Sequence, residues 1–126
     1  MDAQHIHAVS WFEIPVEDFE RARKFYSTIF DYEMPTQDFE GTKMGILPYD
    51  QDKGIGGAIA KSEHHTPAKE GVALYLTADP DLSAVLDRIE DAGGSVITGK
   101  SAVGNQGYVA IFDDTEGNRL GLHSNG

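Results

Sequence analysis

The sequence predicts an α+β fold in which a βαβββ module occurs twice. Two stretches carry apolar residues at helical spacing, and the second stripe superposes on the first after a shift of half the chain. Each stretch follows one β-like segment and precedes three more. A sheet of four strands with a single helix cannot cover both of its own faces, so a repeat of this length indicates a duplicated module. The alternative, coincidence between two ordinary amphipathic helices, is disfavoured because the strand order repeats as well.

The first module, at about residues 5–61, opens on the strand within SWFEIPVED. Its even-numbered residues Phe12, Ile14 and Val16 alternate with the period of a strand that has one buried face. The residues of the opposite face are Trp11, Glu13 and Pro15. A large indole beside a carboxylate is unusual on a strand that faces open water. We therefore expect this second face to line a pocket.

A helix follows within EDFERARKFYSTIFDYEM, where the apolar stripe consists of Phe19, Ala22, Tyr26 and Ile29. The three β-like segments after it are YEMPTQ, TKMGILP and GIGGAIA. The glycines of GIGGAIA invite a phosphate-loop interpretation, but no helix and no P-loop lysine follow them. A closely packed strand explains them better.

The polar stretch at residues 62–70 is the expected linker, and the second module occupies about residues 71–124. Its elements are the strand GVALYLTA, the helix within DPDLSAVLDRIEDAGG and the strands SVIT, GYVAIFDD and RLGLHS. Asp79 is placed to cap the helix, Pro80 suits its first position and Gly93 suits a left-handed stop. The loop GNQG at 104–107 is either a plain connection or a ligand lid.

Composition limits the partners. The 126 residues suit one domain, 1–126, and their 10 basic against 21 acidic side chains give a net charge of -11. Such a field repels phosphate backbones and anionic lipids, which argues against nucleic acid and membrane partners. No apolar run approaches the roughly 20 residues of a spanning helix, and MDAQHIHAVS does not resemble a signal peptide, so a cytoplasmic location is expected. The absence of cysteine leaves only His, Asp and Glu as metal ligands.

Two stretches, WFEIPVEDFERARKFYSTIF and GYVAIFDDTEGNRLGLHS, resemble the vicinal oxygen chelate superfamily, which groups glyoxalase I, bleomycin-resistance proteins and extradiol dioxygenases. The resemblance covers about residues 7–124. It implies a glyoxalase-like fold, in which the curved mixed sheets of two βαβββ modules enclose a cleft, usually within a homodimer. It does not fix the function, because this fold carries several reactions and some proteins that only bind.

The resemblance also implies where a metal would be held. In metal-dependent members the ligands come from the first and last strands of each module and point into the cleft. The matching positions of this chain carry Trp11, Ala73, Gly121 and either Ala58 or Ala60. None of these side chains offers an oxygen or nitrogen donor suited to a divalent ion. We therefore expect a cleft without a metal and without another cofactor.

Strand parity selects the residues that face this cleft. The expected ligand-binding set is Trp11, Glu13, Tyr75, Thr77, Arg119, Met44 and Tyr49. Trp11 and Tyr75 supply flat, partly polar walls. His123 and Glu13 are the candidate catalytic pair, since an imidazole exchanges protons near neutral pH and a carboxylate can orient it. A solvated His at the end of a terminal strand and an exposed Glu are the simpler interpretation.

Other histidines carry weaker signals. His64 and His65 are adjacent and point to opposite sides of an extended chain, so a solvated loop is the expected interpretation. His5 and His7 share a strand parity and could bridge a metal, but they lie near a terminus that is expected to fray.

The expected function is the binding or sequestering of a small organic molecule, neutral or cationic in view of the acidic balance. The alternative is a metal-dependent lyase, isomerase or dioxygenase with ligands at atypical positions such as His7, Glu13 and His123, so whether the protein is an enzyme stays open. A third possibility is an accessory domain whose role is protein association.

Overall fold

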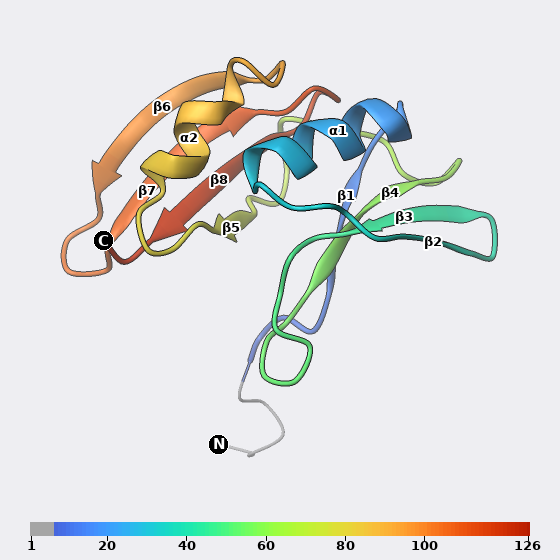
Figure 1. Cartoon of the computed structure of the whole chain (residues 1–126), viewed down its shortest axis with the longest axis horizontal. Coiled ribbons are helices and arrows are strands. Elements are labelled where there is room, and N and C mark those ends of the chain that lie inside the picture. Colours follow the sequence, from blue (N-terminus) through green and yellow to red (C-terminus); the bar gives the residue numbers. More distant parts are fainter. Residues whose placement is uncertain (1–6) are drawn as a thin grey trace.

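The predicted α+β fold with two modules is confirmed by a computed structural model, which describes residues 7–126 (Figure 1). The expectations for His5 lie outside the described residues. The first module contains β1 (Phe12–Pro15), α1 (Phe19–Ile29), β2 (Thr36–Phe39), β3 (Thr42–Ile46) and β4 (Gly57–Lys61). The second contains β5 (Tyr75–Thr77), α2 (Ser83–Ile89), β6 (Ser95–Ala102), β7 (Tyr108–Asp113) and β8 (Arg119–Ser124).

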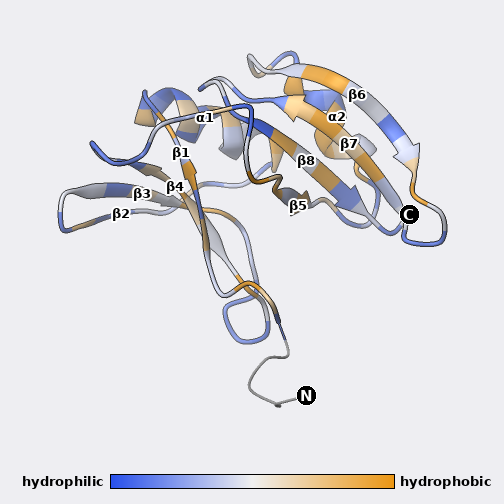
Figure 2. Ribbon diagram, turned by 180° about the vertical axis from the view of Figure 1, so that it is seen from behind, coloured by the Kyte–Doolittle hydropathy of each residue, from blue (hydrophilic) through white to orange (hydrophobic). Residues whose placement is uncertain are grey.

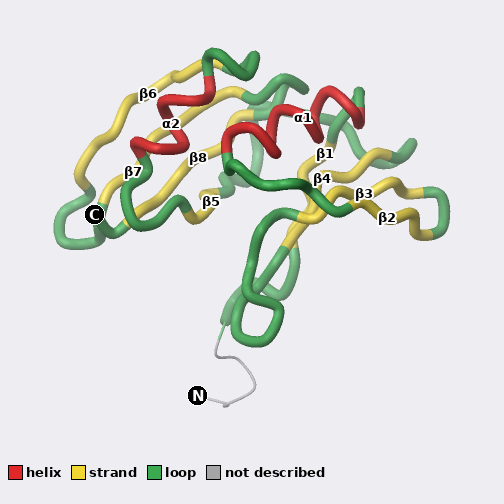
Figure 3. The backbone as a smooth tube through the Cα atoms, viewed as in Figure 1, coloured by secondary structure: helices red, strands yellow, loops and turns green. Residues whose placement is uncertain are grey.

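Both sheets have the same topology. The strand orders are β1-β4-β3-β2 and β5-β8-β7-β6, with the first strand of each module parallel to the last and the other pairs antiparallel. The loop between β3 and β4 and the segment 62–70 are the long connections (Figure 3). β1 and β5 are therefore edge strands of their own sheets.

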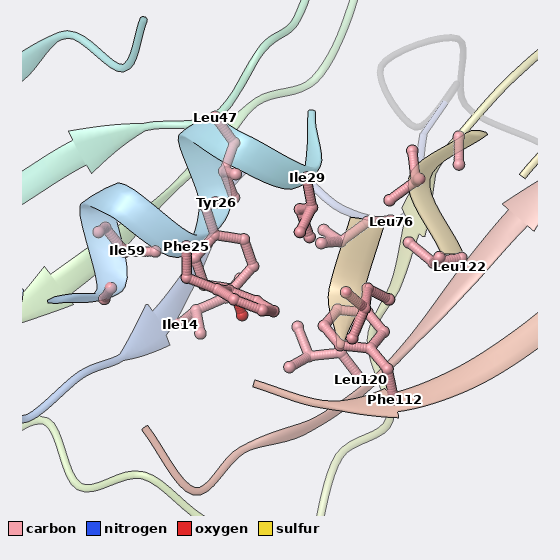
Figure 4. Close-up of a cluster of buried hydrophobic side chains, with 14 of the residues drawn as sticks. Ile14, Phe25, Tyr26, Ile29, Leu47, Ile59, Leu76, Phe112, Leu120 and Leu122 are labelled. Atoms are coloured by element: carbon pink, nitrogen blue, oxygen red, sulfur yellow. The ribbon is translucent and has the colours of Figure 1, made fainter. Parts of the chain in front are cut away.

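One hydrophobic core serves both modules (Figure 4). Phe25 of α1 packs against Phe112 of β7 with ring centroids 6.2 Å apart, and Tyr26 of α1 is completely buried. Ile14 and Val16 of the first strand lie in this core, as the alternation predicted. Phe12 differs from the expectation, because it packs at the margin of the core and is only partly buried.

The turn between β7 and β8 ties the second module to the first helix. The Glu116 carboxylate is fully buried and accepts hydrogen bonds from the backbone N–H groups of Glu17 (3.0 Å) and Asp18 (2.7 Å) at the start of α1. It also accepts from the Arg21 Nε at 2.6 Å. The Glu116 carboxylate therefore accepts from backbone N–H groups next to the start of the helix, where N–H donors lack partners within the helix and a negative charge is stabilised.

A second buried contact lies beside the first. The Tyr26 hydroxyl donates to Asp114 Oδ2 at 2.8 Å, and Asn118 Nδ2 donates both to Asp114 Oδ2 at 2.8 Å and to the Pro15 carbonyl at 2.7 Å. Burial, followed by the negative charge of Asp114, raises the pKa of Tyr26 well above its usual value. Tyr26 is therefore a hydrogen-bond donor at every physiological pH.

The second helix begins later than expected. Asp79 does not cap it; its carboxylate accepts from the backbone N–H of Asn125 at 2.7 Å, and Pro80 also precedes the helix. Asp81 accepts instead from the Ser83 N–H at 2.9 Å. The left-handed turn at Gly93 is confirmed, with φ of +109°. Among residues 7–126, no helix is long and apolar enough to cross a membrane.

Glu116→Gln tests the charge in the module contact. Burial would raise the pKa of Glu116, but the hydrogen bonds from Arg21, Asp18, Thr115 and Glu17 outweigh it and hold the pKa below its usual value. A lowered pKa stabilises the folded state above about pH 4.3, where an unfolded Glu ionises, and this contribution is lost as the pH falls through the folded value.

The variant should lose about 2 kcal/mol of unfolding free energy at pH 7 in urea titrations, and the difference from the native protein should shrink toward pH 3. An equal loss of unfolding free energy at both pH values would show that the packing of the Glu116 side chain, and not its charge, stabilises the contact.

Candidate functional site

Two grooves follow the boundary between β1 and β5, which we call the seam. The smaller groove, about 260 Å³, is lined by β1 residues Phe12–Pro15, by the segment 62–70 and by the start of β8. The larger, about 460 Å³, is lined by Phe12, by the loop before β4 and by Leu74–Thr77. Consecutive residues of both parities line each groove. The grooves therefore run along strand edges and not on one face of a sheet.

Aromatic rings rest on glycines around the larger groove. A Cβ atom built on Gly56 would lie 2.4 Å from the Tyr49 ring, and one on Gly57 would lie 2.4 Å from the Phe12 ring. The glycines of GIGGAIA thus let rings approach the backbone, which supports the close-packed interpretation and not a phosphate loop.

Tyr75 covers Gly121 in the same way. The two residues are register partners in β5 and β8, and a Cβ on Gly121 would lie 2.3 Å from the Tyr75 ring. Tyr75 keeps 48% of its surface exposed. The position at which the resemblance places a metal-binding Glu is therefore occupied by an aromatic face that is open to solvent.

Trp11 lies beside the start of β1 with 39% of its surface exposed. Its indole Nε1 donates to Glu13 Oε2 at 3.2 Å, and its ring meets Tyr49 edge-on with centroids 6.4 Å apart. The structure thus brings together three of the predicted ligand-binding residues, Trp11, Glu13 and Tyr49.

Glu13 also binds a histidine of the segment 62–70. His65 Nε2 lies 2.8 Å from Glu13 Oε1, and His65 Nδ1 lies 2.7 Å from Ser62 Oγ. A carboxylate only accepts, so the Nε2 atom carries a proton. The hydrogen-bonded chain Ser62–His65–Glu13–Trp11 fixes the indole and fastens the segment 62–70 across the first strand.

Sequence reasoning missed His65. The expected solvated loop fits His64, whose side chain is 83% exposed, but the side chain of His65 is only 19% exposed. Its partner Glu13 lies 52 residues away in the sequence, so no local pattern could reveal the contact. The available signal was the isolated carboxylate at position 13, which needs a partner when it is partly enclosed.

The candidate catalytic pair is not joined directly. His123 Nε2 lies 2.7 Å from the carbonyl oxygen of Gln106, in the loop GNQG, while Glu13 is held by His65 and Trp11. A catalytic role for either residue remains a prediction.

The remaining predicted site residues lie at different places. Thr77 lines the larger groove, and Arg119 lines the smaller one with Glu13. The Arg119 guanidinium donates to both oxygens of Asp113, at 2.8 and 3.1 Å, and holds the pKa of that carboxyl below its usual range. Met44 is partly buried on β3 opposite Ala60 and lines neither groove. β8 is hydrophilic near its ends and apolar in its middle (Figure 2).

The donor set does not fit a divalent metal. Trp11, Ala73 and Gly121 offer no ligand atoms, and Ala58 and Ala60 are fully buried on β4. Within residues 7–126, no three His, Asp or Glu side chains lie close enough together to hold an ion.

The family model and the relatives that match this chain carry glyoxalase or glyoxylase names. The profile of the Glyoxalase/Bleomycin resistance protein/Dioxygenase superfamily matches residues 7–122. A glyoxylase-like domain-containing protein from Didymella fabae is 29% identical over 120 residues, covering 87% of this chain and 88% of the relative. CFP32 from Mycobacterium tuberculosis is 27% identical over 118 residues; the match covers 90% of this chain but only 44% of CFP32.

Among solved structures, TnmS3, an antibiotic binding protein from a Streptomyces species, superposes with a TM-score of 0.65 at 24% identity. The superposition covers 95% of this chain and 97% of TnmS3, and it shows a common fold.

The Gly121–Tyr75 contact can be tested by a double-mutant cycle. Gly121→Ala should cost about 1–3 kcal/mol of unfolding free energy, because its methyl group forces the Tyr75 ring from its place. The same substitution in a Tyr75→Ala background should cost markedly less, as measured by urea unfolding. Equal costs in both backgrounds would mean that the ring does not rest on Gly121.

Proposed function

Because this chain belongs to the Glyoxalase/Bleomycin resistance protein/Dioxygenase superfamily, we propose that it binds or sequesters a small organic molecule without using a metal ion. The observation that carries the proposal is the aromatic ring of Tyr75 on Gly121, at a position where the resemblance places a metal ligand. An aromatic wall can stack on an organic ligand. A wall without oxygen or nitrogen ligand atoms does not bind a cation such as zinc.

The proposed site lies at the seam and consists of residues from both modules. The residues proposed to contact the ligand are Trp11, Glu13, Tyr49, Tyr75, Thr77 and Arg119; Met44, which was expected among them, lines neither groove and is not included. Exposed Trp11 and Tyr75 are proposed to stack on a flat part of the ligand. Glu13 and the net charge of -11 favour a neutral or cationic molecule.

The relatives support a binding role without fixing the ligand. TnmS3 is described as an antibiotic binding protein and shares the fold. We propose that the present chain also acts as a homodimer, in which a second copy covers exposed apolar side chains outside the two grooves, such as Ile97.

Metal content is the first test of the proposal. Protein purified without a histidine tag and analysed by plasma mass spectrometry should hold no stoichiometric zinc, nickel, iron or manganese. One tightly bound ion per chain would reject the proposal in favour of a metal-dependent lyase, isomerase or dioxygenase with atypical ligands. His123→Ala would then be the variant of interest, because the residue matters only if a reaction occurs.

Trp11→Ala tests the proposed aromatic wall. For a ligand found by thermal-shift screening, the substitution should weaken binding by about tenfold or more in calorimetric titrations, because it removes a large exposed stacking surface. Phe39→Ala is the matched control, since Phe39 is also an exposed aromatic residue but lies on the outer edge strand β2, away from both grooves. The same affinity for the native protein and Trp11→Ala would place the ligand elsewhere.

A further inference from the structure

The free edge of β1 is turned toward the second module. In a parallel pair only alternate residues direct both N–H and C=O at the neighbouring strand. The Val16 N–H donates to the Ala60 carbonyl at 3.0 Å, so the even-numbered residues bond β4 and the backbone of Glu13 faces away from it. The next odd residue, Pro15, has its carbonyl bound by Asn118 Nδ2 at 2.7 Å, which shows that this edge faces the second module.

The free edge of β5 borders the same grooves. The Gly121 N–H donates to the Leu74 carbonyl at 2.8 Å, and the Ala78 N–H donates to the His123 carbonyl at 2.7 Å. The even-numbered residues of β5 therefore bond β8, and the N–H and C=O groups of Tyr75 and Thr77 face away from it. Within residues 7–126 no strand pairs with either edge.

The seam thus presents two rows of backbone donors and acceptors separated by grooves. The larger groove touches Leu74–Thr77 and the smaller one touches Phe12–Pro15, and both contain Phe12 and Leu74. Backbone groups at an open strand edge bind best to another chain of amide groups. Apolar and aromatic side chains form most of the remaining walls, which suits side chains that alternate along such a ligand.

The charged side chains at the seam favour some ligand charges over others. Glu13 and Glu70 line the smaller groove, and the only cation among its described lining residues, Arg119, is neutralised by Asp113. His65 contributes positive charge beside Glu13 only when it is protonated. An acidic ligand would meet repulsion there, whereas a neutral or basic one would not.

We propose that the seam binds a short, linear, amide-bearing molecule, neutral or basic, which lies between β1 and β5 as an added strand. Its amide groups pair with the backbone of Glu13, Tyr75 and Thr77, and its side groups enter the two grooves. The inference rests on the proposed function and narrows the class of ligand from any small organic molecule to a peptide-like one.

The probes are capped tetrapeptides with a central Phe and a neighbouring Lys, Gln or Glu, each also made with N-methylated amides. In hydrogen-exchange NMR, the Lys and Gln peptides should protect the backbone amides of Glu13, Tyr75 and Thr77. Backbone methylation should weaken binding by about tenfold, because it removes the ladder hydrogen bonds. The Glu peptide should bind more weakly than the Lys peptide.

A substitution in β5 tests the same bonds from the side of the protein. Thr77→Pro removes the seam-facing N–H and leaves the bonds of Leu76 and Ala78 to β8 in place. Thr77→Val replaces the hydroxyl group by a methyl group and keeps the backbone N–H. The proline variant should lose about tenfold more affinity for the peptides than the valine variant. If the proline variant does not fold, the comparison of methylated with unmethylated peptides decides the question.

Three results would overturn the inference. They are the absence of binding by every peptide, an equal affinity for methylated and unmethylated peptides, and protection of the three amides by dimerisation alone. If an aromatic compound library raises the melting temperature while all peptides fail, only this inference is lost. If neither compounds nor peptides bind, the proposed function fails with it.

Discussion

The position of the two modules depends on one buried carboxylate. Glu116, in the turn before β8, binds the backbone N–H groups of Glu17 and Asp18, which directly precede α1, and the side chain of Arg21. Asp114 in the same turn receives the Tyr26 hydroxyl from the middle of that helix. The five-residue turn 114–118 therefore fixes both the end and the rotation of α1 against the second sheet, and with it the distance across the seam. A buried charge is costly unless it is fully paired, and here five donors surround it, including the neighbouring hydroxyl of Thr115.

The hydrophobic core and the seam both lie at the junction of the two modules. Phe25 and Phe112 bring the modules together on the helix side, where apolar burial is complete. On the opposite side of the junction the edges of β1 and β5 are unpaired within the described residues, because no ladder joins these two strands. Around the grooves that border these edges, aromatic rings pack directly on the glycines of β4, β8 and the loop before β4. The same packing thus stabilises the domain and leaves a place for a ligand.

Much of the fold was predictable because its signals are local. Strand alternation placed Ile14 and Val16 in the core, and helical spacing found α1 and α2. The site was predictable only in part. Parity indicated the exposed ring of Tyr75, but Phe12 proved to line the grooves. The capping role assigned to Asp79 was wrong because α2 begins only at Ser83 and Asp79 binds the Asn125 N–H instead. The contact of His65 with Glu13 joins the segment 62–70 to β1 and depends on tertiary folding, which no spacing within either segment encodes.

The stacking of Tyr75 on Gly121 also constrains how this lineage can change. A carboxylate at position 121 needs a Cβ atom where the ring now lies, and loss of the ring alone exposes a strand that carries no side chain at that point. Either substitution made alone is therefore unfavourable, so the effects of changes at the two positions on stability are coupled. A carboxylate at position 121 would accordingly have to be introduced together with a smaller residue at position 75.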